Sequence, residues 1–193
     1  ATALADLIRR GEVTSREVCE AAVERATSVN GSLNAICFPQ FSEALAQDFP
    51  DQGTFAGVPL LLKDLAQEQA GMPCTYGSRG FKNNIAPQDS EFVRRAREGG
   101  LVFLGRTATP EFGLKAITES DLWGPSRNPW NTSLTPGGSS LQWPFWPQTI
   151  ARTHLQRSFD GRILDRCFIR SCGYPHRARQ CSHAGCTWWR GLW

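Results

Sequence analysis

A single lysine stands where a buried strand is expected to end. Lys63 follows the apolar run 58–62 and precedes Asp64. In open α/β sheets, functional groups gather at the carboxyl ends of the strands. Burial there disfavours the charged form of a lysine and lowers its pKa, which would let Lys63 act as a general base near neutral pH. The alternative is a solvated lysine that pairs with Asp64, because lysine side chains are mostly exposed.

A short loop rich in glycine and serine is the second candidate. It reads Thr-Pro-Gly-Gly-Ser-Ser over residues 135–140. Gly137 and Gly138 allow a tight turn and a close approach of the backbone to another group. The adjacent hydroxyls of Ser139 and Ser140 could relay a proton. The alternative is an ordinary glycine-serine loop. A phosphate-binding loop fits poorly, because no lysine follows the glycines at the required spacing.

The chain before these candidates predicts a helical arm. A first helix is expected to stop at Gly11. The next opens with a capping box, Thr14–Glu17, in which a hydroxyl and a carboxylate satisfy free N–H groups. Asn30 and Gly31 predict its end. A short third helix is expected over residues 41–48.

Two short apolar runs predict strands that must position the candidate residues. One covers residues 58–62, with Pro59 near its start, and the other covers 101–104. A helix capped by Ser90 and extending to Glu98 lies between them. Strand, helix and strand in this order form the unit of a parallel sheet, so the fold class is α/β. The helical residues expected to face the core are Phe92, Val93 and Ala96. Residues 118–140 are predicted to be loop.

Read together, these segments resemble the amidase-signature family. The matching segments follow one another in the family's order and cover residues 1–140 almost continuously. Two of them, at residues 110–113 and 127–131, look most like the bacterial branch that includes 6-aminohexanoate cyclic-dimer hydrolases. The matching segments are Leu7-Ile8-Arg9-Arg10-Gly11-Glu12-Val13-Thr14-Ser15, Leu33-Asn34-Ala35, Gly57-Val58-Pro59-Leu60-Leu61-Leu62-Lys63-Asp64, Gly77-Ser78-Arg79, Asp89-Ser90, Gly105-Arg106-Thr107-Ala108-Thr109-Pro110-Glu111-Phe112, Thr118-Glu119-Ser120, Gly124-Pro125-Ser126-Arg127-Asn128-Pro129-Trp130 and Gly137-Gly138-Ser139-Ser140.

The resemblance implies a Ser–cis-Ser–Lys amide hydrolase with a mixed, largely parallel sheet covered by helices. Lys63 matches the family's general base, and Ser139 matches the serine that relays the proton. Gly137, Gly138 and Ser140 match the supporting residues of the catalytic loop. The family needs no metal or organic cofactor, and a small-molecule amide is the expected partner. Its nucleophilic serine lies in a separate Asp-x-Gly-Gly-Ser segment, which is absent from these 193 residues.

The resemblance stops abruptly after Ser140, and the composition changes there. Residues 1–140 carry 13 Lys and Arg against 16 Asp and Glu, whereas residues 141–193 carry 8 Arg, no Lys and 2 Asp. The second segment also holds all three His, five of the seven Trp and four of the seven Cys. It shows little helical or strand periodicity. We therefore expect a truncated amidase-signature domain at 1–140, inactive on its own, and a tail at 141–193 without recognisable fold, produced by a frameshift or a faulty gene prediction.

Two other interpretations of the tail remain open. Its cysteine and histidine side chains could bind zinc, but they lack the paired spacings of known zinc sites. Its Arg and Trp side chains could bind nucleic acid, but they are scattered along the sequence. The residues concerned in the zinc interpretation are Cys172, His176, Cys181, His183 and Cys186.

The remaining sequence features favour a cytoplasmic protein. No secretory signal is recognised at the N-terminus, so Cys19, Cys37 and Cys74 are expected to be reduced thiols. No apolar run is long enough for a membrane-spanning helix, and no membrane or nucleic-acid partner is expected.

Overall fold

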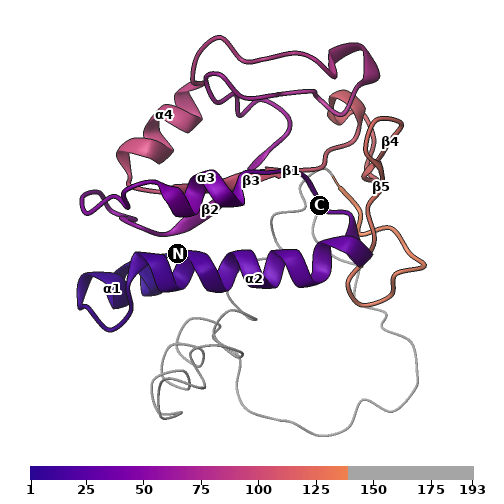
Figure 1. The fold of residues 1–193 in the computed structure, drawn as a ribbon. Helices are drawn as coiled ribbons and strands as arrows, with labels where there is room; N and C mark the ends of the chain where they lie inside the picture. The colour runs from indigo at the N-terminus through magenta and orange to yellow at the C-terminus, as the bar shows by residue number, and fades with distance from the viewer. Residues whose placement is uncertain (139–193) are drawn as a thin grey trace, which may run out of the picture. The chain divides into compact units, whose positions relative to one another are not determined.

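The computed structural model describes residues 1–138 of the 193-residue chain. All of these residues belong to one unit, in which helices alternate along the chain with the strands of a small sheet (Figure 1). The elements are α1 Thr2–Arg9, α2 Ser15–Leu33, β1 Ile36–Pro39, α3 Phe41–Ala46, β2 Pro59–Lys63, the 3-10 turn η1 Arg79–Phe81, α4 Glu91–Glu98, β3 Val102–Thr107, the 3-10 turn η2 Glu111–Gly113, β4 Glu119–Ser120 and β5 Gly124–Pro125.

The predicted capping box at the start of α2 is confirmed. The Thr14 hydroxyl accepts the Glu17 N–H at 3.2 Å, and the Glu17 carboxylate accepts the Thr14 N–H at 2.8 Å. These reciprocal bonds satisfy backbone donors that have no partner within the helix. Ser90 likewise caps α4 through the Val93 N–H at 3.5 Å. Both helices therefore begin where the sequence predicts.

The predicted end of α2 at Asn30 and Gly31 is wrong. The helix continues to Leu33, and Asn34 closes it in the left-handed conformation with φ 49°. The Asn30 side chain is used differently: its oxygen accepts the N–H groups of Ala35 and Ile36 at 2.9 and 2.8 Å. Asn30 thus ties the helix to the start of β1 instead of ending the helix itself. The third helix, predicted over 41–48, ends two residues earlier at Ala46.

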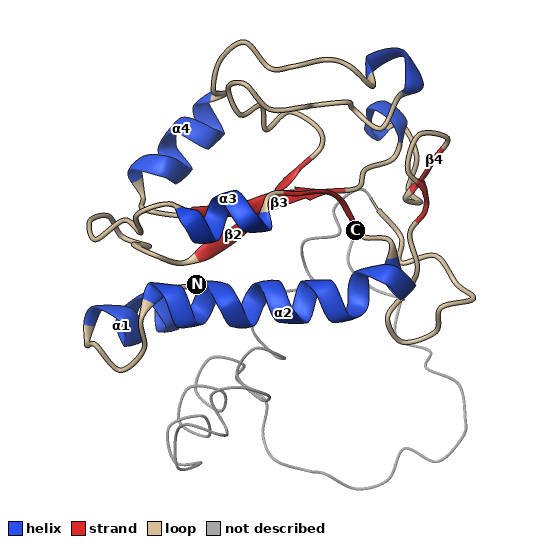
Figure 2. Cartoon of the chain, in the orientation of Figure 1, coloured by secondary structure: helices blue, strands red, loops and turns tan. Residues whose placement is uncertain are grey.

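The main sheet has the order β1-β3-β2. Strands β2 and β3 are parallel, as predicted, and the intervening α4 makes the crossover (Figure 2). Strand β1 was not predicted; it pairs antiparallel with β3, so the sheet is mixed. The register of β3 shifts against both neighbours: the pairing with β1 skips Cys37, and the pairing with β2 skips Leu104. Gly105 has φ +137° and lies so close to β1 that a Cβ there would be 2.4 Å from the Phe38 carbonyl oxygen.

Helices cover the two faces of this sheet. On one face, Cys19 and Ala26 of α2 and Ala44 of α3 pack against β2 and β3. On the other, Val93 and Ala96 of α4 pack against the same two strands. The strand residues in these clusters are Ile36, Leu61, Val102 and Leu104 on the α2 side and Leu62 and Phe103 on the α4 side. Phe92, predicted to face the core, is instead 47% exposed.

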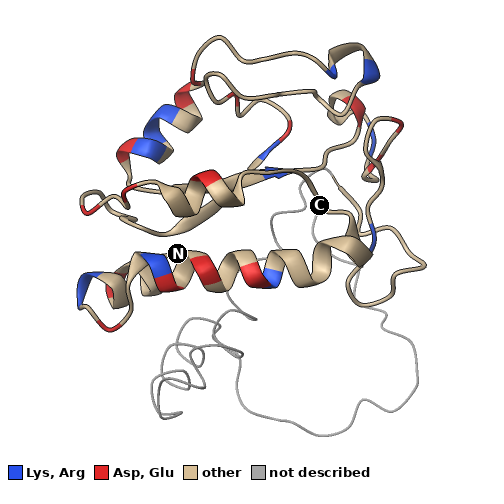
Figure 3. Ribbon diagram, viewed as in Figure 1, with Lys and Arg blue, Asp and Glu red and all other residues tan. Residues whose placement is uncertain are grey.

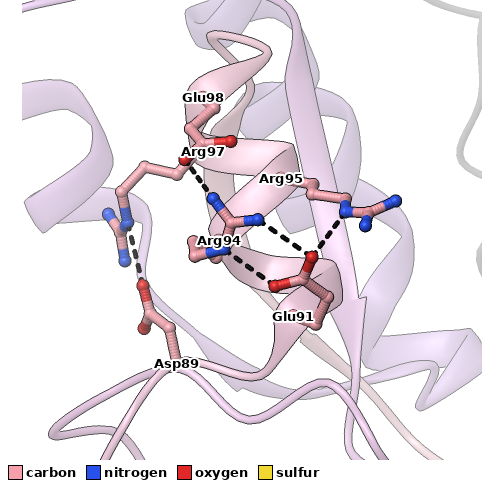
Figure 4. Close-up of polar contacts among 6 residues, drawn as sticks. All are labelled: Asp89, Glu91, Arg94, Arg95, Arg97 and Glu98. Carbon is pink, nitrogen blue, oxygen red and sulfur yellow. Dashed lines mark hydrogen bonds and ion pairs between the residues drawn. The ribbon is translucent and has the colours of Figure 1, made fainter.

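The outward face of α4 carries both charge signs (Figures 3 and 4). Glu91 pairs with Arg94 at 2.8 Å and with Arg95 at 2.7 Å, and Arg97 pairs with Asp89 at 3.2 Å. Hydrogen bonds from the Arg94 and Arg95 guanidinium groups hold the pKa of Glu91 at about 2. Exposed pairs of this kind contribute little to stability. The alternation of signs makes this a solvated helix face, in contrast to a uniformly basic surface.

Candidate active site

Lys63 is the last residue of β2, so it lies at the carboxyl end of a strand, as predicted. It pairs in parallel register with Thr107, the last residue of β3. The side chain is half-buried, and burial lowers the pKa of its ammonium group below the ordinary lysine value. A lysine in this state loses its proton more readily, which is the property required of a general base.

Asp64, the neighbour of Lys63, is a buried carboxylate, only 1% exposed. It accepts the Thr75 N–H at 2.7 Å and the Thr75 hydroxyl. It also accepts the indole N–H of Trp123 at 3.2 Å and the Gly77 N–H at 3.4 Å. Four N–H and O–H groups from two loops thus donate hydrogen bonds to this carboxylate. Asp64 is therefore a structural anchor for the loops around Lys63.

The backbone of Lys63 is held by side chains. Its N–H donates to Gln67 Oε1 at 2.6 Å, and its carbonyl oxygen accepts Arg106 Nη1 at 3.0 Å. The same Nη1 donates to the Gln67 carbonyl at 2.9 Å. Arg106 is fully buried in β3. Neither Arg106 nor Gln67 was predicted as a site residue. A signal was present in the sequence, because Arg106 follows the apolar run of its strand much as Lys63 follows its own.

The glycine-serine loop is described as far as Gly138. The buried Thr118 hydroxyl donates to the Gly137 carbonyl at 2.9 Å, and Gly137 N–H donates to Thr135 Oγ1 at 3.2 Å. Gly137 has φ +80°, and a Cβ at Gly138 would lie 3.0 Å from the Thr118 hydroxyl oxygen. The loop therefore needs glycine for the reason predicted, namely a turn that passes close to another segment. Ser139 and Ser140 lie outside the described residues.

The described residues also bear on the thiols, on membrane-spanning helices and on metal ligands. Cys19, Cys37 and Cys74 are free thiols, as predicted. No helix in this part of the chain could span a membrane, and no group of three or more potential metal-ligating side chains occurs in it. The proposed zinc ligands and the whole tail at 141–193 lie outside the described residues.

Comparison with known proteins supports the sequence resemblance. The sequence pattern of the Amidase family matches residues 17–140. The 6-aminohexanoate-cyclic-dimer hydrolase of Paenarthrobacter ureafaciens is 43% identical over 142 residues, which cover 72% of this chain and 29% of that protein. A glutamyl-tRNA(Gln) amidotransferase component of Chromohalobacter salexigens is 38% identical over 147 residues, covering 72% and 30% respectively.

The fold agrees with the sequence comparison. A solved structure of 6-aminohexanoate cyclic dimer hydrolase complexed with substrate superimposes with a TM-score of 0.65 and 42% identity, covering 72% of this chain and 29% of that one. This chain therefore spans less than a third of the length of the relatives it matches. The α/β fold with a mixed sheet and the amidase-signature resemblance are both confirmed. The chain belongs to the Amidase family.

Proposed function

We propose that residues 1–140 are the N-terminal part of an amidase that hydrolyses small carboxamides by a Ser–cis-Ser–Lys mechanism. The observation that carries the proposal is the state of Lys63. It is a half-buried lysine with a lowered pKa at the carboxyl end of a strand, in a chain of the Amidase family. Gly137 and Gly138 support the glycine-serine loop 135–140, and Ser140 is a further supporting residue.

In the proposed reaction, neutral Lys63 is the general base and Ser139 is the relay. The nucleophilic serine, from the segment absent in these 193 residues, adds to the amide carbonyl carbon. Its proton passes to the Ser139 oxygen, while the Ser139 proton passes to Lys63 Nζ. The resulting ammonium returns a proton through the same relay to the leaving nitrogen as the C–N bond breaks. Water then hydrolyses the acyl-enzyme, with Lys63 again accepting the proton. No metal or organic cofactor takes part.

A small amide is the substrate class we favour. Relatives that match this chain in both sequence and structure are named for a cyclic amide dimer. Another relative is named for a tRNA-linked amidotransferase reaction. Residues 1–140 have 13 basic against 16 acidic side chains, a balance that does not favour a nucleic-acid partner. We also place the protein in the cytoplasm, since its described cysteines are free thiols.

We further propose that residues 141–193 derive from a shifted reading frame and that the 193-residue chain has no amidase activity. The support is the change in composition after Ser140 and the missing nucleophile segment. Sequencing the transcript tests the first part, and an intact frame encoding this tail would contradict it. Serine-dependent turnover of an amide by the purified chain would contradict the second.

A chimera tests the role of Lys63. Residues 1–140 replace the matching segment of the Paenarthrobacter hydrolase, and hydrolysis of 6-aminohexanoate cyclic dimer is measured. Lys63→Met should lower turnover by about 10²–10⁴-fold, the usual contribution of a general base. The matched control is Lys115→Met, the same change at an exposed position, which should leave turnover unaltered. A loss below about tenfold for Lys63→Met would show that Lys63 is not the base.

A further inference from the structure

The hydrogen bonds of the Lys63 peptide groups come from side chains. Strand β2 lies beside β3 in the described sheet of order β1-β3-β2, and the peptide groups of Lys63 point away from β3. Backbone donors and acceptors that are withdrawn from water need another partner. At Lys63 the partners are Gln67 Oε1 for the N–H, at 2.6 Å, and Arg106 Nη1 for the carbonyl, at 3.0 Å.

The two partners are themselves joined. Arg106 Nη1 also donates to the Gln67 carbonyl at 2.9 Å, so one nitrogen holds both ends of the segment 63–67. Ala66 within this segment has φ +55°, a left-handed conformation that is unfavourable for a residue with a Cβ. Such conformations persist only where surrounding contacts determine them, and they cluster at functional sites. The closed set of bonds supplies that constraint.

The burial of Arg106 is unfavourable for the stability of the fold. Its side chain is fully buried, and its Nε and Nη2 have no hydrogen-bond partner among residues 1–138. No ion pair to its guanidinium occurs in the described part of the chain. Burying a charge with unsatisfied donors is unfavourable, and well-packed apolar side chains often replace buried ions without loss of stability. A role in geometry accounts for keeping an arginine here.

We propose that the side chains of Gln67 and Arg106 together form a clamp that positions Lys63. The clamp holds the backbone N–H and the backbone carbonyl of Lys63. This inference rests on the proposed function, in which Lys63 is the general base. Gln67 and Arg106 are positioning residues, because they contact the backbone of Lys63. Without the clamp, the strand end can shift, and the Lys63 side chain can reach solvent.

The first experiment measures Lys63 directly in the full 193-residue chain. The sequence contains three lysines, Lys63, Lys82 and Lys115, so reductive ¹³C-methylation gives few signals, and Lys63→Arg assigns the one of interest. Gln67→Met removes the acceptor for the Lys63 N–H without changing any charge. The titration midpoint of Lys63 should then rise by about 0.5 pH unit or more as the side chain gains solvent.

The matched control is Gln69→Met, the same substitution two positions along the chain. The Gln69 Oε1 atom is buried and has no hydrogen-bond partner in the described part of the chain, so its loss should leave the Lys63 midpoint in place. A midpoint that is equal in wild type, Gln67→Met and Gln69→Met would overturn the clamp. Equal shifts in both variants would also overturn it, because they would indicate a general loosening.

Arg106 provides a second test that allows rescue. Arg106→Met removes the donor and keeps an unbranched apolar stem, whereas Arg106→Gln keeps an N–H donor. Both variants lose the cation, whose removal by itself raises the midpoint of Lys63, so the comparison between them isolates the hydrogen bond. The clamp predicts that Lys63 titrates at lower pH in Arg106→Gln than in Arg106→Met. The same midpoint in both variants would contradict the clamp.

Turnover by the chimera separates the clamp from the proposed function. Gln67→Met should lower kcat by about tenfold with little change in KM, since positioning of the base is lost and substrate binding is not. If Lys63→Met abolishes turnover while Gln67→Met changes neither kcat nor the Lys63 midpoint, the clamp is wrong and the role of Lys63 as general base is supported. If Lys63→Met leaves turnover intact, the proposed function is wrong, and a midpoint shift in Gln67→Met would still confirm the clamp's hold on Lys63.

Discussion

The indole N–H of Trp123 donates a hydrogen bond to the Asp64 carboxylate at 3.2 Å, joining residues 59 positions apart. Asp64 directly follows the last residue of β2, and Trp123 lies in the turn between β4 and β5. The same N–H also approaches the Thr75 hydroxyl oxygen at 3.1 Å. One buried carboxylate thereby ties the loops at 75–77 and 121–123 to the end of the strand that carries Lys63.

Trp123→Phe should destabilise the fold measurably. The substitution keeps an aromatic ring but removes the N–H from a buried carboxylate, and hydrogen bonds to charged groups contribute about 1.5–3 kcal/mol. Urea unfolding followed by circular dichroism would measure the loss. Trp130→Phe is the control, because Trp130 is 92% exposed and should change stability by less than about 0.5 kcal/mol. Equal effects at the two positions would show that the Trp123 bond contributes nothing.

Gly105→Ala should be among the most damaging single-methyl additions. A Cβ there would lie 2.4 Å from the Phe38 carbonyl oxygen, and φ is +137°. Steric overlap and backbone strain together should cost at least about 3 kcal/mol, or prevent folding.

Gly31→Ala is the matched control with the opposite sign. Gly31 lies within α2, and a Cβ there meets nothing within 4 Å. Alanine should stabilise the helix by about 0.5–1 kcal/mol. Thermal unfolding of the two variants would reveal the difference, and a destabilising Gly31→Ala would mean that α2 ends at Gly31 after all.

The buried thiols predict a loss of stability at alkaline pH. Burial raises the pKa of Cys19 to about 12 and that of Cys74 to about 11, from a reference of 9.0. The folded state therefore holds these protons more tightly than the unfolded state. Their contribution is complete below about pH 9 and is lost as the pH rises through the folded-state values. Urea midpoints measured between about pH 8 and pH 11 should fall, and Cys19→Ala with Cys74→Ala should flatten the decline.

Alkylation gives an independent check on the same thiols. At about pH 8, iodoacetamide should modify Cys19 and Cys74 far more slowly in the native chain than in urea, because the thiolate is the reactive form and both residues are fully buried. Peptide mapping by mass spectrometry would identify each site. Equal rates in the native and the urea-treated chain would contradict the burial of these residues.

The two serines after Gly138 should not be equivalent. In the chimera, Ser139→Ala should slow acylation strongly, and Ser140→Ala should have a smaller effect, because Ser139 matches the relay and Ser140 the supporting position. Pre-steady-state release of the amine product measures acylation separately from later steps. A larger loss with Ser140→Ala would mean that the proposed register is wrong by one residue.

Much of the fold follows from short-range signals in the sequence. The Thr14 and Ser90 caps, two parallel strands and the placement of Lys63 at a strand end were predictable. The strands were predicted at 58–62 and 101–104 and are found at 59–63 and 102–107, so the second extends three residues further than its apolar run. Caps and strands are predictable because a cap requires only residues within about four positions, and an apolar run is buried wherever it lies. The amidase resemblance likewise needed only the order of short segments.

Only the tertiary structure decided the contacts between distant residues. The sequence does not reveal that the Asn30 side chain binds the start of β1, so the end of α2 was predicted too early, at Asn30 and Gly31. Strand β1 carries only four residues and gains its identity from pairing with β3. The burial of Asp64 beside Trp123, and the Arg106 bond to Lys63 across 43 positions, arise for the same reason. A polar side chain chooses its partner from the groups that packing brings within about 3 Å, and packing is a property of the whole chain.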